Sequence, residues 1–243
     1  MKLNRRNLLS GIGGLTGGII LGVCSDANRA LAIVPPEKSE EPMGGEVTAT
    51  EDLMREHGVL RRALFVYSES ANRLRKNPSD VAPDALQKTA RLFRTFGEDY
   101  HERKLEEAYI FPAVKKAVGI AAGLTDILVE QHNRGRDVTD YVLDLTRTAK
   151  FGAENAESLA RALDIMVRMY RPHAAREDTI VFPAWKQTLT AKQLDEMNDK
   201  FEDIERQMLG ENGFENAVRQ ISDIETELGL ADLSQFTAPI LRR

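Results

Sequence analysis

Apolar residues recur at helical spacing along most of the chain from residue 51 onward. The first run covers residues 51–77, and the turn-forming sequence NPSDVAP ends it. Its main apolar positions fall on one face of a helix: Leu53, Leu60, Leu64 and Tyr67. This spacing predicts a long amphipathic helix with one face turned toward a core.

Three further runs predict helices of similar length. They are expected from Asp84 to about Val118, from about Leu124 to Ala149, and from about Ala153 to Leu189. Gly119 and Gly123 separate the first two of these runs, and the sequence KFG separates the last two. Four long amphipathic helices joined by short loops predict an all-α fold, an up-down-up-down four-helix bundle over residues 51–189.

Two shorter apolar stripes follow the fourth run. They lie in residues 191–209 and 214–228, and they predict two additional C-terminal helices within an extension that covers residues 190–243. We expect both stripes to pack on the bundle instead of remaining free for a partner.

The chain before the first helix has a different character. Residues 33–50 are rich in Pro, Gly and Glu and predict a flexible linker. In residues 1–32, the pair Arg5-Arg6 precedes an uncharged stretch with six glycines, and ALA at residues 30–32 offers small residues for cleavage. This leader resembles a twin-arginine signal peptide, which implies that the twin-arginine translocase exports the folded protein.

We expect cleavage after Ala32 and a periplasmic or otherwise exported protein. Two alternatives would tether the same body to a membrane: an uncleaved leader, or lipid attachment at Cys24 in the sequence LGVC.

Composition and charge narrow the classes of function. Aromatic residues are 6% and charged residues 29% of the chain, as suits solvated helices. The net charge is -5, and it becomes more negative without the basic leader, so nucleic acid is not an expected partner. Cys24 is the only cysteine and lies in the leader, which excludes a disulfide, a thiolate metal site and a cysteine nucleophile from the body.

A short pattern occurs twice in the body. YHERKLEEAYIFPAV (residues 100–114) is followed by RPHAAREDTIVFPAW (residues 171–185). Alignment on Phe-Pro-Ala pairs Glu106 with Glu177, and Glu107 with Asp178. The Phe-Pro pairs themselves are expected to be packing and kink residues.

Each copy also carries a histidine, and so does the helix before it. His101 lies ten residues before the phenylalanine of its copy, and His173 lies nine before its own. His57, in REHGVL, and His132, in EQHNRG, lie on the preceding helices, and these four are all the histidines in the chain. The body therefore reads as two helix pairs, each with a histidine on both helices and an acid on the second.

This constellation predicts a metal site. Histidine and carboxylate ligands without a thiolate suit Fe, Mn or Zn. Two carboxylates shared among four histidines favour a dinuclear centre, because each carboxylate can bridge two ions and cancel part of their charge. No nucleophile-base pair is expected elsewhere in the chain, and no catalytic residue is assigned.

These motifs resemble the hemerythrin-like, HHE cation-binding family. The resemblance covers about Glu51 to Gln187 and rests on His57 and the sequences HERKLEEAYIFP, EQHNRG and HAAREDTIVFP. It implies a helix bundle around a non-haem di-iron centre, with two Fe ions expected ahead of Mn or Zn. By position, it implies that the metal ligands are His57, His101, His132 and His173, with Glu106 and Glu177 as bridges.

One departure from that family affects the expected function. Oxygen-carrying members have a fifth histidine one helical turn from the one that matches His132, but Leu128 and Arg136 occupy both such positions here. One iron therefore lacks a nitrogen ligand, and an oxygen donor would replace it. Glu102 is the first candidate for this additional metal ligand, with Tyr100, Tyr170 and water as others.

Loss of that histidine argues against reversible oxygen carriage. We expect an exported protein whose di-iron centre interacts with O2 or a related small molecule such as NO or peroxide, in sensing, redox chemistry or iron handling. One alternative is a redox enzyme that acts on peroxide or NO at the same irons, so enzymatic activity stays open. Another is a bundle in which the metal is purely structural, and no protein partner is assigned.

The unequal spacing in the two copies predicts a local helix defect. At 100° per residue, His173 and Glu177 are separated by about 40° and share a face, whereas His101 and Glu106 are separated by about 140°. A single π-bulge absorbs one extra residue. We therefore expect one between His101 and Glu106.

Overall fold

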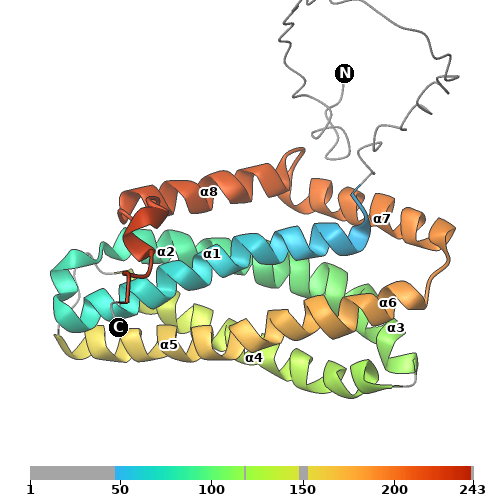
Figure 1. Cartoon of the computed structure of the whole chain (residues 1–243), viewed down its shortest axis with the longest axis horizontal. Helices are drawn as coiled ribbons and strands as arrows, with labels where there is room; N and C mark the ends of the chain where they lie inside the picture. The colour runs from blue at the N-terminus through green and yellow to red at the C-terminus, as the bar shows by residue number, and fades with distance from the viewer. Residues whose placement is uncertain (1–46, 118, 148–152, 242–243) are drawn as a thin grey trace, which may run out of the picture. The chain divides into compact units, whose positions relative to one another are not determined.

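A computed structural model describes residues 47–117, 119–147 and 153–241. The expected leader and residues 33–46 of the expected linker lie outside the described residues. The described part is predominantly helical and contains no strand, so the all-α prediction is confirmed. The α-helices are α1 Ala49–Lys76, α2 Pro83–Leu92, α3 Phe111–Lys116, α4 Ile120–Leu145, α5 Ala153–Arg176, α6 Phe182–Gln187, α7 Ala191–Leu209 and α8 Gly213–Glu227 (Figure 1).

Two π-helical segments, η3 Phe93–Ile110 and η4 Glu177–Val181, connect α2 to α3 and α5 to α6 without a break. Two short 3-10 helices are also present, η2 Pro78–Asp80 and η5 Leu233–Phe236. Among the described helices, none combines the length and apolar character that a membrane span requires.

The start of α1 shows why the chain becomes helical at Thr48. The hydroxyl of Thr48 accepts a hydrogen bond from the N–H of Glu51, and the carboxylate of Glu51 accepts one from the N–H of Thr48 at 2.8 Å. This reciprocal capping box satisfies two N–H groups that a helix start leaves unpaired. The helix consequently begins two residues before the predicted start at residue 51.

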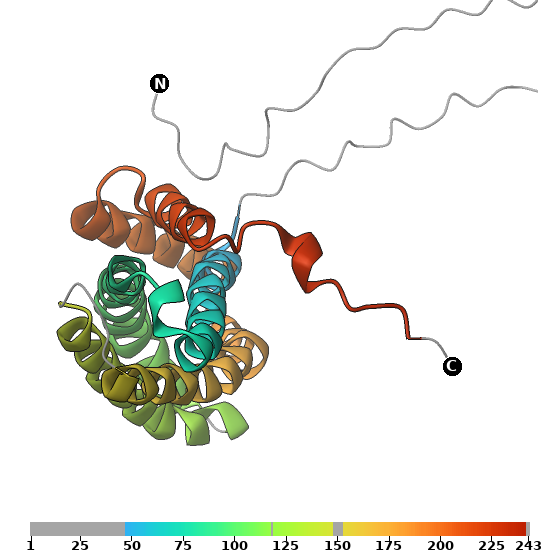
Figure 2. The same ribbon diagram turned by 90° about the vertical axis from the view of Figure 1, so that its left-hand side faces the viewer.

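The long helices pack side by side around a shared core. α5 lies along α1 and α4, and η3 contacts α1, α2 and α4 (Figure 1). α7 and α8 cover the α1, α2 and η3 side (Figure 2), where Phe201 and Ile221 are buried in the core. The prediction that the two C-terminal stripes pack on the bundle is therefore confirmed.

The boundary between α3 and α4 differs from its prediction. Gly119 has a φ of 138°, which disfavours any residue with a Cβ, and α4 starts directly after it at Ile120. Gly123 therefore lies inside α4 and does not separate two helices. α4 is described to its end at Leu145, while residues 148–152 are not described.

The expected defect between His101 and Glu106 is present, but it is much longer than a single bulge. The π-helical geometry spans the whole of η3, and the N–H of Phe111 donates to the carbonyl of Glu106, five residues back. Because i→i+5 bonding widens the turn, His101 and Glu106 share a face. A π turn that the spacing did not predict follows Glu177 in the second copy, where the N–H of Phe182 donates to the carbonyl of Glu177.

Candidate metal centre

The four histidines of the chain meet inside the bundle, one from each long segment. His57 comes from α1, His101 from η3, His132 from α4 and His173 from α5, and all four are buried. They form two close pairs, with 3.1 Å between the Nε2 atoms of His57 and His101, and 3.1 Å between those of His132 and His173. We call the His57/His101 pair the first position and the His132/His173 pair the second position.

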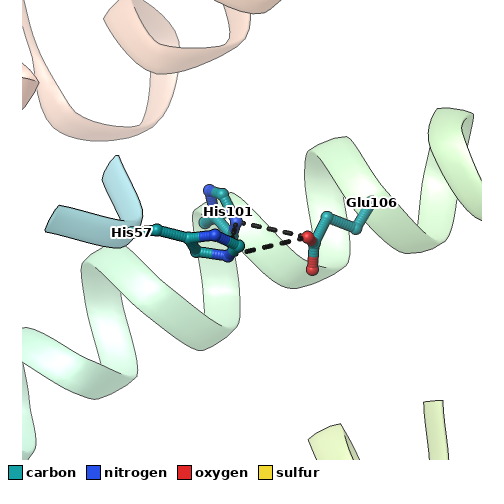
Figure 3. Close-up of side chains that lie close together, drawn as sticks. All are labelled: His57, His101 and Glu106. Carbon is teal, nitrogen blue, oxygen red and sulfur yellow. Dashed lines mark hydrogen bonds and ion pairs between the residues drawn. The ribbon is translucent and has the colours of Figure 1, made fainter. Parts of the chain in front are cut away.

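Glu106 lies between the two positions. Its Oε1 is 3.3 Å from Nε2 of His101 and 4.0 Å from Nε2 of His57, as Figure 3 shows for the first position. Its Oε2 is 3.3 Å from Nε2 of His132 in the second position. One carboxylate therefore offers one oxygen to each pair of histidines.

Glu177 repeats this arrangement from the second half of the chain. Its Oε1 is 3.0 Å from Nε2 of His173 and 3.8 Å from Nε2 of His132. Its Oε2 is 3.5 Å from Nε2 of His57. Each position thus has two imidazole nitrogens and one oxygen from each of the two carboxylates.

The carboxylate oxygens provide a test of whether a cation fits. All four oxygens of Glu106 and Glu177 are buried and have no hydrogen-bond partner. A buried carboxylate without partners is costly, and burial together with the charge of Glu106 holds the pKa of Glu177 well above its usual range. Divalent ions at the two positions would supply the missing positive charge, and the nitrogen and oxygen donors suit Fe, Mn or Zn.

The histidines respond differently to this environment. Burial, with the nearby charge of His132, lowers the pKa of His173 to about 3, so this ring is neutral and its Nε2 can coordinate at neutral pH. Burial alone would lower the pKa of His101, but Glu106 and Glu56 outweigh it and raise that pKa well above its usual range. Without a metal, protons therefore take part of the neutralising role.

Every site histidine is oriented by a partner on its outer nitrogen. The Nδ1 contacts are His57 with Asp178 at 2.7 Å, His101 with Glu56 at 2.7 Å, His132 with Glu107 at 2.9 Å and His173 with Gln131 at 2.9 Å. These bonds place the proton on Nδ1 and turn Nε2 inward, as metal-binding histidines require.

The repeated Phe-Pro-Ala pattern has a packing role. Phe182 stacks on the ring of His57 with 5.4 Å between ring centroids, and Phe111 stacks on His132 at 5.5 Å. Each phenylalanine therefore covers a histidine that the other half of the chain supplies. The prolines that follow both π-helical segments have no N–H to extend the wide turns.

Glu102 lies beside the centre, where Glu102, Glu107 and His132 form a further group of possible metal ligands. Its oxygens accept hydrogen bonds from the hydroxyl of Tyr170 at 2.7 Å and from Arg136 at 3.0 Å. Its approach to His132 is at the outward Nδ1, 4.0 Å away. Tyr100, another candidate oxygen donor, donates instead to Glu56 at 2.8 Å.

The residues that hold the histidines from outside were not predicted from the sequence. Two of them, Glu56 and Gln131, immediately precede a site histidine, while the other two, Glu107 and Asp178, form the second acidic pair of the repeat. Because these residues occupy equivalent places in the two halves, the repeat could have indicated that they share a role. The repeat could not show on which side of the rings these groups would lie.

Comparison with known proteins agrees with this geometry. The sequence-family model described as the hemerythrin HHE cation binding domain matches residues 48–185. This chain belongs to the hemerythrin HHE cation-binding family. The hemerythrin domain thus coincides with the segment that supplies all six facing residues.

Relatives extend the similarity beyond that domain. Uncharacterized proteins of Mycobacterium bovis and Mycobacterium tuberculosis are 42% identical over 236 residues, which cover 97% of this chain and 91% of each relative. The similarity therefore includes the helices α7 and α8 that follow the hemerythrin domain. No solved structure matches the chain significantly.

Proposed function

We propose that this hemerythrin-family protein holds a non-haem di-iron centre in an up-down-up-down four-helix bundle and that the centre interacts with O2 or a related small oxidant. The observation that carries the proposal is the placement of Glu106 and Glu177, each with one oxygen toward each histidine pair. Four histidines and two carboxylates placed between them can hold two adjacent dications, and the carboxylates offset part of the positive charge.

The protein groups supply binding, orientation and protection from water. Each position has four facing donors, fewer than the six that iron commonly takes, so coordination remains for a small molecule. When bound, the irons would supply the redox chemistry. The stacked rings of Phe111 and Phe182 cover His132 and His57 and keep bulk water from those donors.

The composition of the donor set favours sensing, redox chemistry or iron handling over reversible carriage. Arg136 occupies one of the two places for a fifth histidine, and its guanidinium binds the carboxylates of Glu102 and Glu107. A centre with relatively more oxygen donors favours the harder, more highly charged ferric ion. We therefore infer that oxidation to a stable diferric state is the usual outcome of contact with O2.

An optical experiment tests this proposal. Metal-free protein is loaded anaerobically with ferrous iron, O2 is admitted, and near-ultraviolet and visible bands are recorded before and after the gas is removed. New absorption that persists after degassing is expected. Full recovery of the ferrous spectrum would support a carrier instead, and an absence of spectral change, with zinc in the native protein, would support a structural metal.

We also propose that the twin-arginine route exports the protein to the periplasm after it has folded and acquired metal. The pair Arg5-Arg6 and the small residues at 30–32 support this route. Replacement of both arginines by lysine should trap the precursor in the cytoplasm, as fractionation and the apparent mass would show. Processed protein outside the cytoplasm of the double variant would refute the route.

A further inference from the structure

The surroundings of the two positions are related by the internal repeat. Glu107 and Asp178 are equivalent in the repeat, and each binds Nδ1 of the first histidine of the other half, His132 and His57 respectively. The arginine four residues after that histidine binds the same carboxylate: Arg61 with Asp178, and Arg136 with Glu107. These supporting groups match in chemistry as well as in place.

One equivalent pair differs in charge. The residue before His57 is Glu56, whose carboxylate accepts from Nδ1 of His101 at 2.7 Å. The residue before His132 is Gln131, whose amide oxygen accepts from Nδ1 of His173 at 2.9 Å. Both histidines of the first position are therefore backed by carboxylates, whereas one histidine of the second position is backed by a neutral amide.

This difference acts on metal affinity through the rings. A carboxylate that accepts the Nδ1 proton makes Nε2 a stronger donor, and loss of such an outer partner typically costs about 10- to 100-fold in metal affinity. Glu56 is also almost fully buried, so solvent screens its charge only weakly. The neutral amide of Gln131 offers neither effect to the second position.

We propose that the two metal positions are unequal, with the His57/His101 position filling first and binding a divalent ion about 10- to 100-fold more tightly than the His132/His173 position. The inference rests on the proposed dinuclear function and deepens it. At limiting metal, the protein holds one ion at the first position. The ion at the second position is the one that exchanges, so loss of metal passes through a defined half-loaded state.

Cobalt(II) is a suitable probe because it reports on its site by visible absorption and by anomalous scattering. Metal-free protein is crystallised with one equivalent of Co2+, and a parallel solution is titrated and followed optically. Anomalous density at His57/His101 and a two-phase titration are expected. Equal density at the two positions, density mainly at His132/His173, or two indistinguishable affinities would overturn the inference.

Matched substitutions test the cause. Gln131→Glu should raise the affinity of the second phase to within a few-fold of the first, and Glu56→Gln should lower that of the first phase by about 10- to 100-fold. The double exchange should reverse the order of filling, with circular dichroism to verify folding. An unchanged second phase in folded Gln131→Glu would refute the assigned cause.

The number and equivalence of cobalt ions bound by the wild-type protein distinguish a failure of the proposed dinuclear function from a failure of this inference. Wild-type protein that binds cobalt at neither position would refute the dinuclear function and this inference together. Wild-type protein that binds two equivalent ions would refute the inference alone.

Discussion

Glu106→Gln is expected to disrupt metal binding at both positions, whereas Glu107→Gln should weaken only the second. Glu106 offers Oε1 to His101 and Oε2 to His132, each at 3.3 Å. Glutamine keeps the size of the side chain but offers a single oxygen and no charge, so each position loses either a donor or neutralising charge. Metal content after gel filtration should fall from about two ions per chain to less than one.

Glu107→Gln is the matched control because it makes the same chemical change one residue away. Among the site histidines, Glu107 contacts only the outer Nδ1 of His132, at 2.9 Å, and it also accepts from Arg136. Its replacement should cost about 10- to 100-fold at that position alone. Both variants should retain the wild-type circular dichroism spectrum. If folded Glu106→Gln keeps both ions under the same conditions, Glu106 does not bridge.

Much of this centre could be predicted from the sequence because its donors follow helical periodicity. His57 and His132 lie on helices whose apolar stripes fix which face is buried, and the repeat links each to a second helix with a histidine and an acid. These local patterns were sufficient to select six residues that the structure brings together. The selection needed no knowledge of the loops.

The helix boundaries and the extent of the π-helical geometry could not be predicted from the spacing of apolar residues and site residues. Gly119 and Gly123 look alike in the sequence, and only the positive φ of Gly119 identifies it as the residue before α4. The five-residue spacing of His101 and Glu106 required the helix to absorb one extra residue. It did not determine the length of helix over which that residue would be absorbed. The 18-residue extent of η3 therefore exceeds what the spacing implied.

The surroundings of Glu102 depend on contacts that proximity in the sequence does not reveal. Glu102 follows His101 directly, so it was the nearest candidate along the chain. In the fold, Arg136 from α4 and Tyr170 from α5 bind its two oxygens. Those partners are distant in sequence, and a single sequence does not reveal such competing contacts.

Removal of metal from the wild-type protein is expected to lower its melting temperature by about 10 °C while leaving it helical at room temperature. An ion present at about 1,000 times its dissociation constant stabilises the fold by about 4 kcal/mol, and about 1 kcal/mol shifts the melting temperature of a domain of this size by about 2–4 °C. Without metal, Glu106 and Glu177 remain buried with four oxygens that have no hydrogen-bond partner. Much of the core lies outside this cluster, however, as in the stacking of Tyr67 on Phe93 and of Trp185 on Phe201.

The measurement compares anaerobic thermal melts of metal-free and reconstituted protein by circular dichroism, with Glu177→Gln as the control. Because burial and the charge of Glu106 hold the pKa of Glu177 well above its usual range, an ionised Glu177 is unfavourable without metal. Metal-free Glu177→Gln should therefore melt at or above metal-free wild type, although its reconstituted form should melt lower than reconstituted wild type. If the variant melts at or above wild type without metal but below it with metal, the stabilisation comes from ions bound at Glu106 and Glu177. Equal melting of metal-free and reconstituted wild type would contradict that assignment. Loss of helicity at room temperature without metal would instead favour a purely structural metal, since the surrounding core would then be unable to maintain the fold alone.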